Sequence, residues 1–448
     1  MPKALLIHAT DPDICLAEQP PFPFPVLGIT TLAGLFPPEW EVEVVDENFQ
    51  SPDLSDRPDL LGISSLTLDV VHAYSLADAY RQQGVPVLMG GMHASAMPQE
   101  ALKHADAVVV GEAEGVLGQV LEDAKLGRMH GIYTGPHPDL TGLPKPRLDL
   151  LPQESLERLA PVQSSRGCPR DCDFCSVTPF FGHRYRTRPI EDVVGEVEDV
   201  LKAGRTKTFF FVDDNIAGRP GYAKELFKAL IPLKIKWGSF ASVAMTGDLE
   251  LMRLARDSGC IELFMGIESI RQENLNASNK AWVRTDRLLE CIRIFHDHGI
   301  IIEGSFIFGH DHDTRDVFAQ TVEFIQKSAI QVPVFGILTP YPATRLRDRL
   351  LKEDRLLPEA DDWRLYDGSH VLFRPAGMSP EELEEGFLWT KKYCAAPRSI
   401  FSRVFRAPKG NRLTALGLNF SMRSGRMRQI AARWPKAVKG PLTRPATW

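Results

Sequence analysis

The chain has 448 residues and a formal net charge of −6, and its hydrophobic and charged fractions of 44% and 25% are those of an ordinary globular protein. This composition excludes a disordered or fibrous protein, and the length predicts two or three domains. The sequence contains no run of about 18 apolar residues, so it predicts no transmembrane helix. The first residues lack the long apolar region and cleavage site of a signal peptide. We therefore expect a cytoplasmic protein.

Cysteine usage supports a reducing compartment. The chain has seven cysteines, and three of them, Cys168, Cys172 and Cys175, lie within eight residues. A secreted disulfide framework would instead distribute an even number of cysteines through a short chain. An odd count with one tight group indicates a metal site.

Residues 1–130 alternate between apolar runs that stop at small residues and stretches with helical periodicity. This alternation predicts a doubly wound, Rossmann-like parallel sheet, which binds ligands at the carboxyl ends of its strands. We expect strands at 4–9, 42–49, 60–66, 85–95 and 106–115, with a helix at 69–84.

Residues 131–160 are rich in Pro and Gly and predict a linker. Over residues 161–345 the alternation resumes as six strand–helix units, which predicts a partial (β/α)6 barrel of the TIM type. The expected strands are 161–165, 207–214, 236–243, 260–269, 300–309 and 332–340. The expected helices are 190–204, 221–233, 248–259, 285–299 and 314–329. Residues 346–397 predict a helical C-terminal region packed against this barrel.

The last segment, residues 398–448, is strongly basic. It contains twelve Lys or Arg and no Asp or Glu, so it carries +12 while the preceding residues carry −18. The segment can be a solvated, partly disordered terminus or a contact for an anionic surface. Its stretches IFSRVFR and MRQIAARW mix basic and apolar residues at helical spacing, which favours peripheral contact with the inner face of a membrane. No nucleic-acid motif is present, and we expect no nucleic acid partner.

The cysteine group follows the first expected barrel strand in the segment SSRGCPRDCDFC. Three thiolates can hold three irons of a 4Fe-4S cluster and leave the fourth iron open for the amino and carboxylate groups of a small molecule. A structural zinc site is the alternative, but it needs four protein ligands, and the nearest further candidate is His183.

Cys-x3-Cys-x2-Cys at the first strand of a six-unit barrel resembles the radical S-adenosylmethionine (SAM) superfamily. The resemblance implies that Cys168, Cys172 and Cys175 hold the cluster, and that Phe174 packs near the adenine of SAM. It also implies that the cluster cleaves SAM reductively to a 5'-deoxyadenosyl radical that abstracts hydrogen.

Further SAM contacts are expected at the ends of later strands. The segment FVDDN replaces the common Gly-Gly-Glu, and Asp213, Asp214 or Asn215 can accept from the SAM ammonium or cap the next helix. Ser242 ends the third strand. Glu268 is similar to a carboxylate that binds the SAM ribose, although it can also be an acid at a helix start. His310 and His312 suggest substrate contact or loop polarity.

A doubly wound domain ahead of this barrel resembles the cobalamin-binding class B radical SAM enzymes. The matching positions are small or polar residues at strand ends, namely Ser64, Ser65, Thr67, Gly90, Gly91, Gly111 and Glu112. Small residues let the backbone approach a large flat macrocycle. The segment HATDPDICLAEQ lacks the Asp-x-His-x-x-Gly pattern whose His ligates cobalt, so binding without that ligand is implied. A sheet that serves only as a substrate lid is the alternative.

The order of QSSRGCPRDCDFC, FFFVDDNIAG, MGIES, GILTPYPATRLRDRL and SPEELEEGF resembles the group that includes the hopanoid C-2 methylases, over roughly residues 1–400. This resemblance implies a methyltransferase with a 4Fe-4S cluster, SAM and cobalamin, acting on an unactivated carbon of a lipid or secondary metabolite. A non-methylating rearrangement or cyclisation enzyme is the second hypothesis, and a non-catalytic cobalamin sensor is the third. A flavodoxin or ferredoxin is the expected electron donor.

Overall fold

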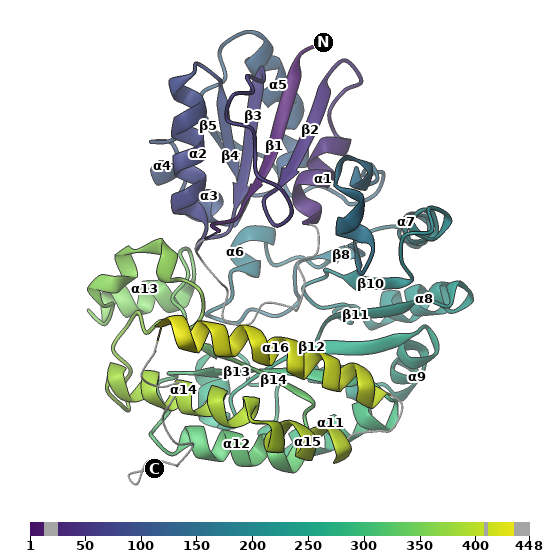
Figure 1. Cartoon of the computed structure of the whole chain (residues 1–448), viewed down its shortest axis with the longest axis vertical. Helices are drawn as coiled ribbons and strands as arrows, with labels where there is room; N and C mark the ends of the chain where they lie inside the picture. Colours follow the sequence, from purple (N-terminus) through teal and green to yellow (C-terminus); the bar gives the residue numbers. More distant parts are fainter. Residues whose placement is uncertain (13–25, 407–410, 434–448) are drawn as a thin grey trace.

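The computed structural model describes residues 1–12, 26–406 and 411–433 (Figure 1). Figure 1 shows two α/β units, with the N-terminal sheet at the top, the barrel sheet below it, and the short helix α6 (Val177–Phe181) between them. Within the described ranges, no helix is both long and apolar enough to cross a membrane.

The N-terminal unit is built on a six-stranded parallel sheet with the order β2-β1-β3-β4-β5-β6. The strands are β1 (Lys3–Ala9), β2 (Glu41–Asp46), β3 (Leu60–Ser65), β4 (Val87–Gly90), β5 (Ala107–Val110) and β6 (Gly131–Thr134). The helices are α1 (Leu27–Gly34), α2 (Val70–Gln82), α3 (Gly91–Ala96), α4 (Pro98–Ala101) and α5 (Leu117–Lys125). This is the expected doubly wound fold, and its strand order reverses beside β1, where such sheets bind ligands.

Two local features differ from the sequence-based expectation. Residues 85–95 were expected as one strand, but β4 ends at Gly90, and α3 begins at Gly91 with φ of +89°. A left-handed residue cannot continue a strand, and the Gly-Gly pair therefore turns the chain. The segment 131–160 was expected as a linker, but its first residues form β6, which pairs with Ala107–Val110. A four-residue edge strand followed by Gly-Pro carries little periodic signal.

The second unit has six parallel strands in chain order, β7-β10-β11-β12-β13-β14, as expected for a partial barrel. They are β7 (Ala160–Val162), β10 (Thr208–Phe211), β11 (Lys236–Ala241), β12 (Cys260–Glu268), β13 (Ile301–Phe308) and β14 (Val332–Ile337). The helices are α7 (Ile190–Lys202), α8 (Pro220–Leu230), α9 (Leu249–Asp257), α10 (Gln272–Ala277), α11 (Leu288–Asp297) and α12 (Val317–Ser328). A small antiparallel pair, β8 (Ser165–Arg166) with β9 (Arg186–Thr187), brackets the cysteine segment.

The C-terminal region contains α13 (Arg345–Lys352), α14 (Pro380–Ala395), α15 (Pro397–Arg406) and α16 (Arg412–Arg433). Part of this region returns to the N-terminal unit instead of packing only on the barrel: Trp363 and Tyr366 join the core around Tyr74 and Tyr80 of α2. The Trp363 indole N–H donates to Glu100 at 2.8 Å. The chain therefore connects its two units a second time, far from the linker.

The described part of the basic segment is folded. Ile400, Val404 and Ala415 pack against Val332 and Val334 of the barrel sheet, and Figure 1 shows α16 crossing β12–β14. The expectation of a solvated, partly disordered terminus therefore does not hold for α15 and α16, because apolar residues at helical spacing had a sheet to cover. Residues 407–410 and 434–448 of this segment lie outside the described ranges.

Candidate functional site

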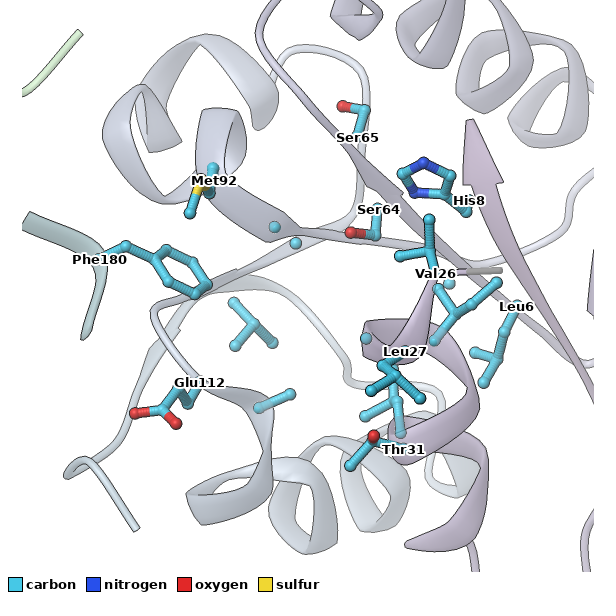
Figure 2. Close-up of a pocket in the computed structure, with 18 of the residues that line it drawn as sticks. Leu6, His8, Val26, Leu27, Thr31, Ser64, Ser65, Met92, Glu112 and Phe180 are labelled. Atoms are coloured by element: carbon cyan, nitrogen blue, oxygen red, sulfur yellow. The ribbon is translucent and has the colours of Figure 1, made fainter. Parts of the chain in front are cut away.

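A deep cavity lies at the carboxyl ends of the N-terminal strands, at the point where the strand order reverses (Figure 2). It has about 1460 Å³ of empty space, including its open mouth. Six of the residues expected to contact cobalamin line it, namely Ser64, Ser65, Gly90, Gly91, Gly111 and Glu112. The seventh, Thr67, lines a neighbouring cavity instead.

The floor of this first cavity is an apolar slot. Leu6 of β1 pairs in register with Gly62 of β3, and Gly62 pairs with Leu88 of β4, so these residues form one row on one face of the sheet. Leu27 and Leu32 of α1 cover that row from the other side. Gly62 adds no side chain to this slot, and a Cβ there would lie 2.8 Å from Leu6 Cδ2, so the glycine lets Leu6 pack over the sheet and keeps the slot flat.

The rim of the first cavity, formed by the strand ends around Ser64, Gly91 and Gly111, is closely packed. Gly91 has φ of +89°, and a Cβ there would lie 2.7 Å from Ser64 Oγ. The Ser95 hydroxyl, one turn along α3, accepts the Gly111 amide at 2.9 Å. These small residues bring the strand ends close enough for backbone to contact a large flat ligand, and the slot and rim together fit a macrocycle with a ring-bearing tail.

Glu112 was expected to contact cobalamin, but its carboxylate is occupied by basic side chains of the protein. Its buried carboxylate accepts from Arg166 at 2.6 Å, from Arg186 at 2.6 Å and from His137 at 2.9 Å. Burial would raise the pKa of Glu112, but hydrogen bonds from Arg186 and Arg166 outweigh it and hold the pKa below its ordinary value. Glu112 therefore ties the N-terminal unit to the β8–β9 pair.

The cysteine segment runs from β8 into α6 and faces the N-terminal unit. Cys168, Cys172 and Cys175 are unpaired thiols in the described residues. Burial raises the pKa of Cys168, and it raises those of Cys172 and Cys175 to about 11 and 12. Metal binding to such thiols replaces their protons, because a thiol must be deprotonated to act as a metal ligand.

Over the described residues, no three His, Cys, Asp or Glu side chains converge on a point that could hold a single metal ion. This finding is compatible with a 4Fe-4S cluster, because each thiolate of a cluster binds a different iron.

Asp213 and Asp214 are used to fix the cysteine segment. Buried Asp213 accepts from Ser164 N at 3.0 Å and from Ser165 Oγ at 2.5 Å. Asp214 accepts the Gly167 amide at 2.9 Å, and Gly167 has φ of +83° immediately before Cys168. Both carboxylates therefore already accept hydrogen bonds from residues 164–167. To bind the SAM ammonium, they would have to give up these hydrogen bonds.

Asn215 remains open to a ligand. Its side chain donates to the Cys168 thiol, and its Oδ1 is buried without a partner among the described residues. A buried amide oxygen without a donor is costly, and it is the acceptor that an ammonium group beside the cluster requires. Ser242, also expected at a SAM contact, lies half-buried at the end of β11.

Glu268 lies at a bulge at the end of β12 with φ of +63°. Its carboxylate binds Lys280 Nζ at 2.7 Å, and Ser305 Oγ lies 3.5 Å away on the neighbouring strand. A Cβ at Gly266 would meet both Glu268 and Lys280, so the glycine leaves room for this pair. Lys280 lowers the pKa of Cys172, which places the pair beside the cysteine segment.

Phe174 packs beside His310, with ring centroids 6.4 Å apart and an edge-to-face orientation. Burial lowers the pKa of His310 to about 4, and its Nε2 has no partner in the part of the chain that the structure describes. Phe174 and His310 thus form an aromatic surface beside Cys175, with one polar atom, His310 Nε2, that lacks a partner among the described residues. His312 contributes its backbone to this region, since its amide donates to Asn274.

A second cavity adjoins the first between the two units. It is lined by Thr67 and Leu68 after β3, by Ser176 and Phe180 after the cysteines, and by Tyr341 after β14. Leu66, Met92, Gly111 and Phe180 line both cavities. Its lining contains no Lys, Arg, Asp or Glu among the described residues.

Several residues of this site were not expected from the sequence. Arg166, Arg186, Lys280, Met92 and Phe180 act here through contacts between distant segments. The signal that could have found the two arginines is their position on either side of the cysteines, but no spacing rule links them to Glu112.

Comparison with known proteins identifies the chain. A B12 binding domain model matches residues 15–121, and a Radical SAM superfamily model matches residues 162–325. The bacteriochlorophyllide d C-12(1)-methyltransferase of Chlorobaculum tepidum is 31% identical over 395 residues, which cover 86% of this chain and 85% of the relative. The chain belongs to the cobalamin-binding radical SAM family.

Two further relatives support this assignment. The hopanoid C-2 methylase of Rhodopseudomonas palustris is 27% identical over 74% of this chain and 65% of its own length. The solved structure of the radical SAM methyltransferase TsrM from Kitasatospora setae, with cobalamin and a [4Fe-4S] cluster, shares the fold. It has a TM-score of 0.72 and 16% identity, and the match covers 97% of this chain and all of that one.

Membership confirms the predicted fold, the enzyme class and the three cofactors: a 4Fe-4S cluster, SAM and cobalamin. The two curated relatives named above are a methyltransferase and a methylase, which supports C-methylation as the reaction. The assignment of individual residues to these cofactors stays a prediction.

Proposed function

We propose that this enzyme methylates an unactivated carbon of an apolar small molecule, a lipid or a secondary metabolite. The observation that carries the proposal is the shared wall of the two cavities. A molecule in the second cavity lies beside the first cavity, across Met92 and Phe180, and beside Ser176, which directly follows Cys175. One substrate carbon there can reach both a cluster-bound SAM and a cobalamin at the strand ends.

We assign the site residues by their positions. Cys168, Cys172 and Cys175 would hold the cluster; Asn215, Ser242, Glu268 and Phe174 would contact SAM; and Ser64, Ser65, Gly90, Gly91 and Gly111 would contact cobalamin. When bound, these cofactors supply a deoxyadenosyl radical that removes hydrogen and a methyl group that replaces it.

The residues of the chain itself orient the reactants and exclude water. Asp213 and Asp214 fix the cysteine segment, Glu112 fixes the distance between the two units, and Lys280 orients Glu268. Phe180 and Met92 close the wall between the cavities with apolar surface. A site that excludes water and holds the reactants in fixed orientations favours one reaction of a radical over competing side reactions.

The lining of the second cavity supports an uncharged substrate. A carboxylate or phosphate buried there would find no Lys or Arg among the described lining residues, and the one lining imidazole, His137, already contacts Glu112. Burying an unpaired charge is strongly unfavourable. The hydroxyls of Thr67 and Ser176 and the ring of Tyr341 suit an apolar molecule with a few hydroxyl or carbonyl groups.

The test is anaerobic reconstitution with iron, sulfide and hydroxocobalamin, followed by reduction in the presence of SAM and candidate lipids. Methylation predicts 5'-deoxyadenosine and S-adenosylhomocysteine together, and a product heavier by one methylene unit. Deoxyadenosine with an isomeric or oxidised product would establish the rearrangement or cyclisation hypothesis instead. An intact cluster that yields neither product would contradict the proposal.

We propose a flavodoxin or a ferredoxin as the electron donor, working in the cytoplasm. Arg345 is half-exposed and binds Asp171 of the cysteine segment at 2.6 Å, so it offers positive charge to an acidic donor near the cluster. Arg345→Glu should slow SAM cleavage with flavodoxin and leave the rate with dithionite unchanged. Equal loss with both reductants would show that Arg345 only supports the loop.

We also propose that α15 and α16 bind an anionic membrane surface. Phe401, Phe405 and Phe420 are 41%, 56% and 39% exposed, and they touch in a continuous patch with ring centroids 5.8 and 5.9 Å apart. Arg412 lies 5.9 Å over Phe405, and Arg398 and Arg406 are exposed on α15. Aromatic and basic side chains on one surface, without any acidic residue after Glu385, suit the lipid–water boundary.

Vesicle sedimentation tests this surface. The double variant Phe401→Ser/Phe405→Ser should weaken binding to phosphatidylglycerol vesicles roughly tenfold or more, because each buried Phe contributes about 1.5–3 kcal/mol. Leu351→Ser removes a similarly exposed apolar side chain on α13 and serves as the control. Equal binding by all three proteins, or binding to neutral vesicles alone, would contradict a role for this patch.

A further inference from the structure

His8 occupies an unusual position in the first cavity. It is the penultimate residue of β1, and it pairs in register with Asp46 on β2 and with Ser64 on β3. These three polar residues form a row one level above the apolar floor of Leu6 and Gly62. Figure 2 shows His8 and Ser64 at the edge of the cavity, with Leu6 and Leu27 near them.

The imidazole of His8 is buried but not satisfied. Only 7% of the residue is exposed, and its Nδ1 has no hydrogen-bond partner among the described residues. The neighbouring Asp46 carboxylate is already occupied by the amides of Val26 and Asn48. Burial lowers the pKa of His8, and Asp46 and Glu47 offset this only in part, so the ring is neutral near pH 7. Its Nδ1 is therefore available for a hydrogen bond with a ligand.

The order of polarity in the cavity matches one part of cobalamin. The nucleotide tail carries a flat aromatic base, which suits the apolar slot, followed by a sugar and a phosphate, which need hydrogen bonds. The slot lies between Gly62 and α1, and the first polar groups above it are His8 and Ser64. A buried polar group without a protein partner, at the boundary between apolar and polar walls, is the group that a bound ligand would satisfy.

We propose that His8 binds the nucleotide tail of cobalamin by a hydrogen bond at the rim of the slot, and that it does so together with Ser64. His8 is then a binding residue for the tail and not for the corrin ring. The inference concerns how the cofactor is held, and it stands whether the reaction is methylation or rearrangement.

Cobinamide provides a sharp test, because it has the corrin ring without the nucleotide tail. Dissociation constants of hydroxocobalamin and of cobinamide would be measured by visible absorption for the native protein, His8→Ala, His8→Gln and His130→Ala. His8→Ala should weaken cobalamin binding about tenfold, the value of one lost hydrogen bond, and leave cobinamide binding unchanged. His8→Gln, which keeps a donor and an acceptor, should recover part of the loss. The exposed His130 is the matched control and should change neither.

The outcomes separate the possible failures. Equal weakening of both ligands by His8→Ala would overturn the proposal, since it would show a contact with the ring or a general loss of the fold. Unchanged cobalamin binding in His8→Ala would overturn it as well. Failure of the native protein to bind either corrinoid would contradict the cofactor assignment itself, which is a different result.

Discussion

Glu112 and Arg166 join the two units of the molecule through a buried ion pair of 2.6 Å. Arg166 also pairs in register with Arg186 across the β8–β9 strands. Two arginines directly opposite each other repel, and the carboxylate of Glu112 accepts from both. The conformation of the segment that leads into Cys168 therefore depends on a residue from the other unit.

Replacing Glu112 by Gln should destabilise the protein strongly. It leaves two buried guanidinium groups with less compensation, and removal of one partner from a buried pair costs about 3–5 kcal/mol. Urea unfolding would measure this loss, and cobalamin affinity should fall with it. Glu122→Gln removes an exposed acid that pairs with Lys125 and should cost less than about 1 kcal/mol. Similar effects of the two variants would contradict the role of Glu112 as a tie between units.

The three expected cluster ligands should behave alike and differ from other cysteines. Substitution of Cys168, Cys172 or Cys175 by Ala should remove the iron–sulfur absorbance after reconstitution and lower SAM cleavage by at least about 100-fold, because the site loses a ligand. Cys291→Ser, at a half-buried thiol that accepts from Thr246, should keep full absorbance. Iron content and 5'-deoxyadenosine yield are the readouts. A reconstituted cluster in any of the three Ala variants would exclude that cysteine as a ligand.

Gly91 and Gly84 form a matched pair for testing the rim of the first cavity. Both have positive φ, +89° and +81°, so Ala strains the backbone at either position by about 1–2 kcal/mol. At Gly84 the new Cβ meets nothing within 4 Å, whereas at Gly91 it lies 2.7 Å from Ser64 Oγ. Gly91→Ala should therefore reduce cobalamin affinity, while Gly84→Ala should affect stability alone. Equal cobalamin affinity in both variants would show that this rim does not hold the cofactor.

Asp213 should make stability depend on pH in a defined direction. Burial raises its pKa to about 7, against the opposing hydrogen bonds from Ser165 and Ser164. Between about pH 4 and pH 7 the folded state keeps a proton that the unfolded state has released, so this group lowers stability as pH rises. Asp213→Asn has no such proton. The free energy of unfolding of the variant relative to the native protein should therefore increase from about pH 5 to about pH 8. Parallel curves would contradict the raised pKa.

Much of the fold could be predicted because its signals are local. Each barrel strand is an apolar run ending near a small or acidic residue, and each expected strand in 161–345 overlaps an observed one. The cysteine spacing is equally local, and it led directly to the family. The turn at Gly91 was missed because two glycines inside an apolar run do not show which one adopts positive φ.

The roles of individual side chains were harder to predict, because they depend on contacts across the chain. Asp213 and Asp214 follow a strand, as a ligand would, but their oxygens point back to Ser164 and Gly167. Asn215, one residue later, faces Cys168. The sequence of one segment predicts which of its side chains point in the same direction. It does not predict which of them already form hydrogen bonds with a neighbouring loop.

The contact between Trp363 and Glu100 spans 263 positions of the sequence. The hydrophobic core around α2 includes Trp363, Tyr366 and Leu372, so the N-terminal unit is discontinuous in sequence. During synthesis its sheet can form early, but part of its core stays uncovered until the ribosome has translated most of the chain. A nascent chain halted after the barrel strands would expose the apolar surface around Tyr74 and Tyr80, which is where we expect a chaperone to bind it.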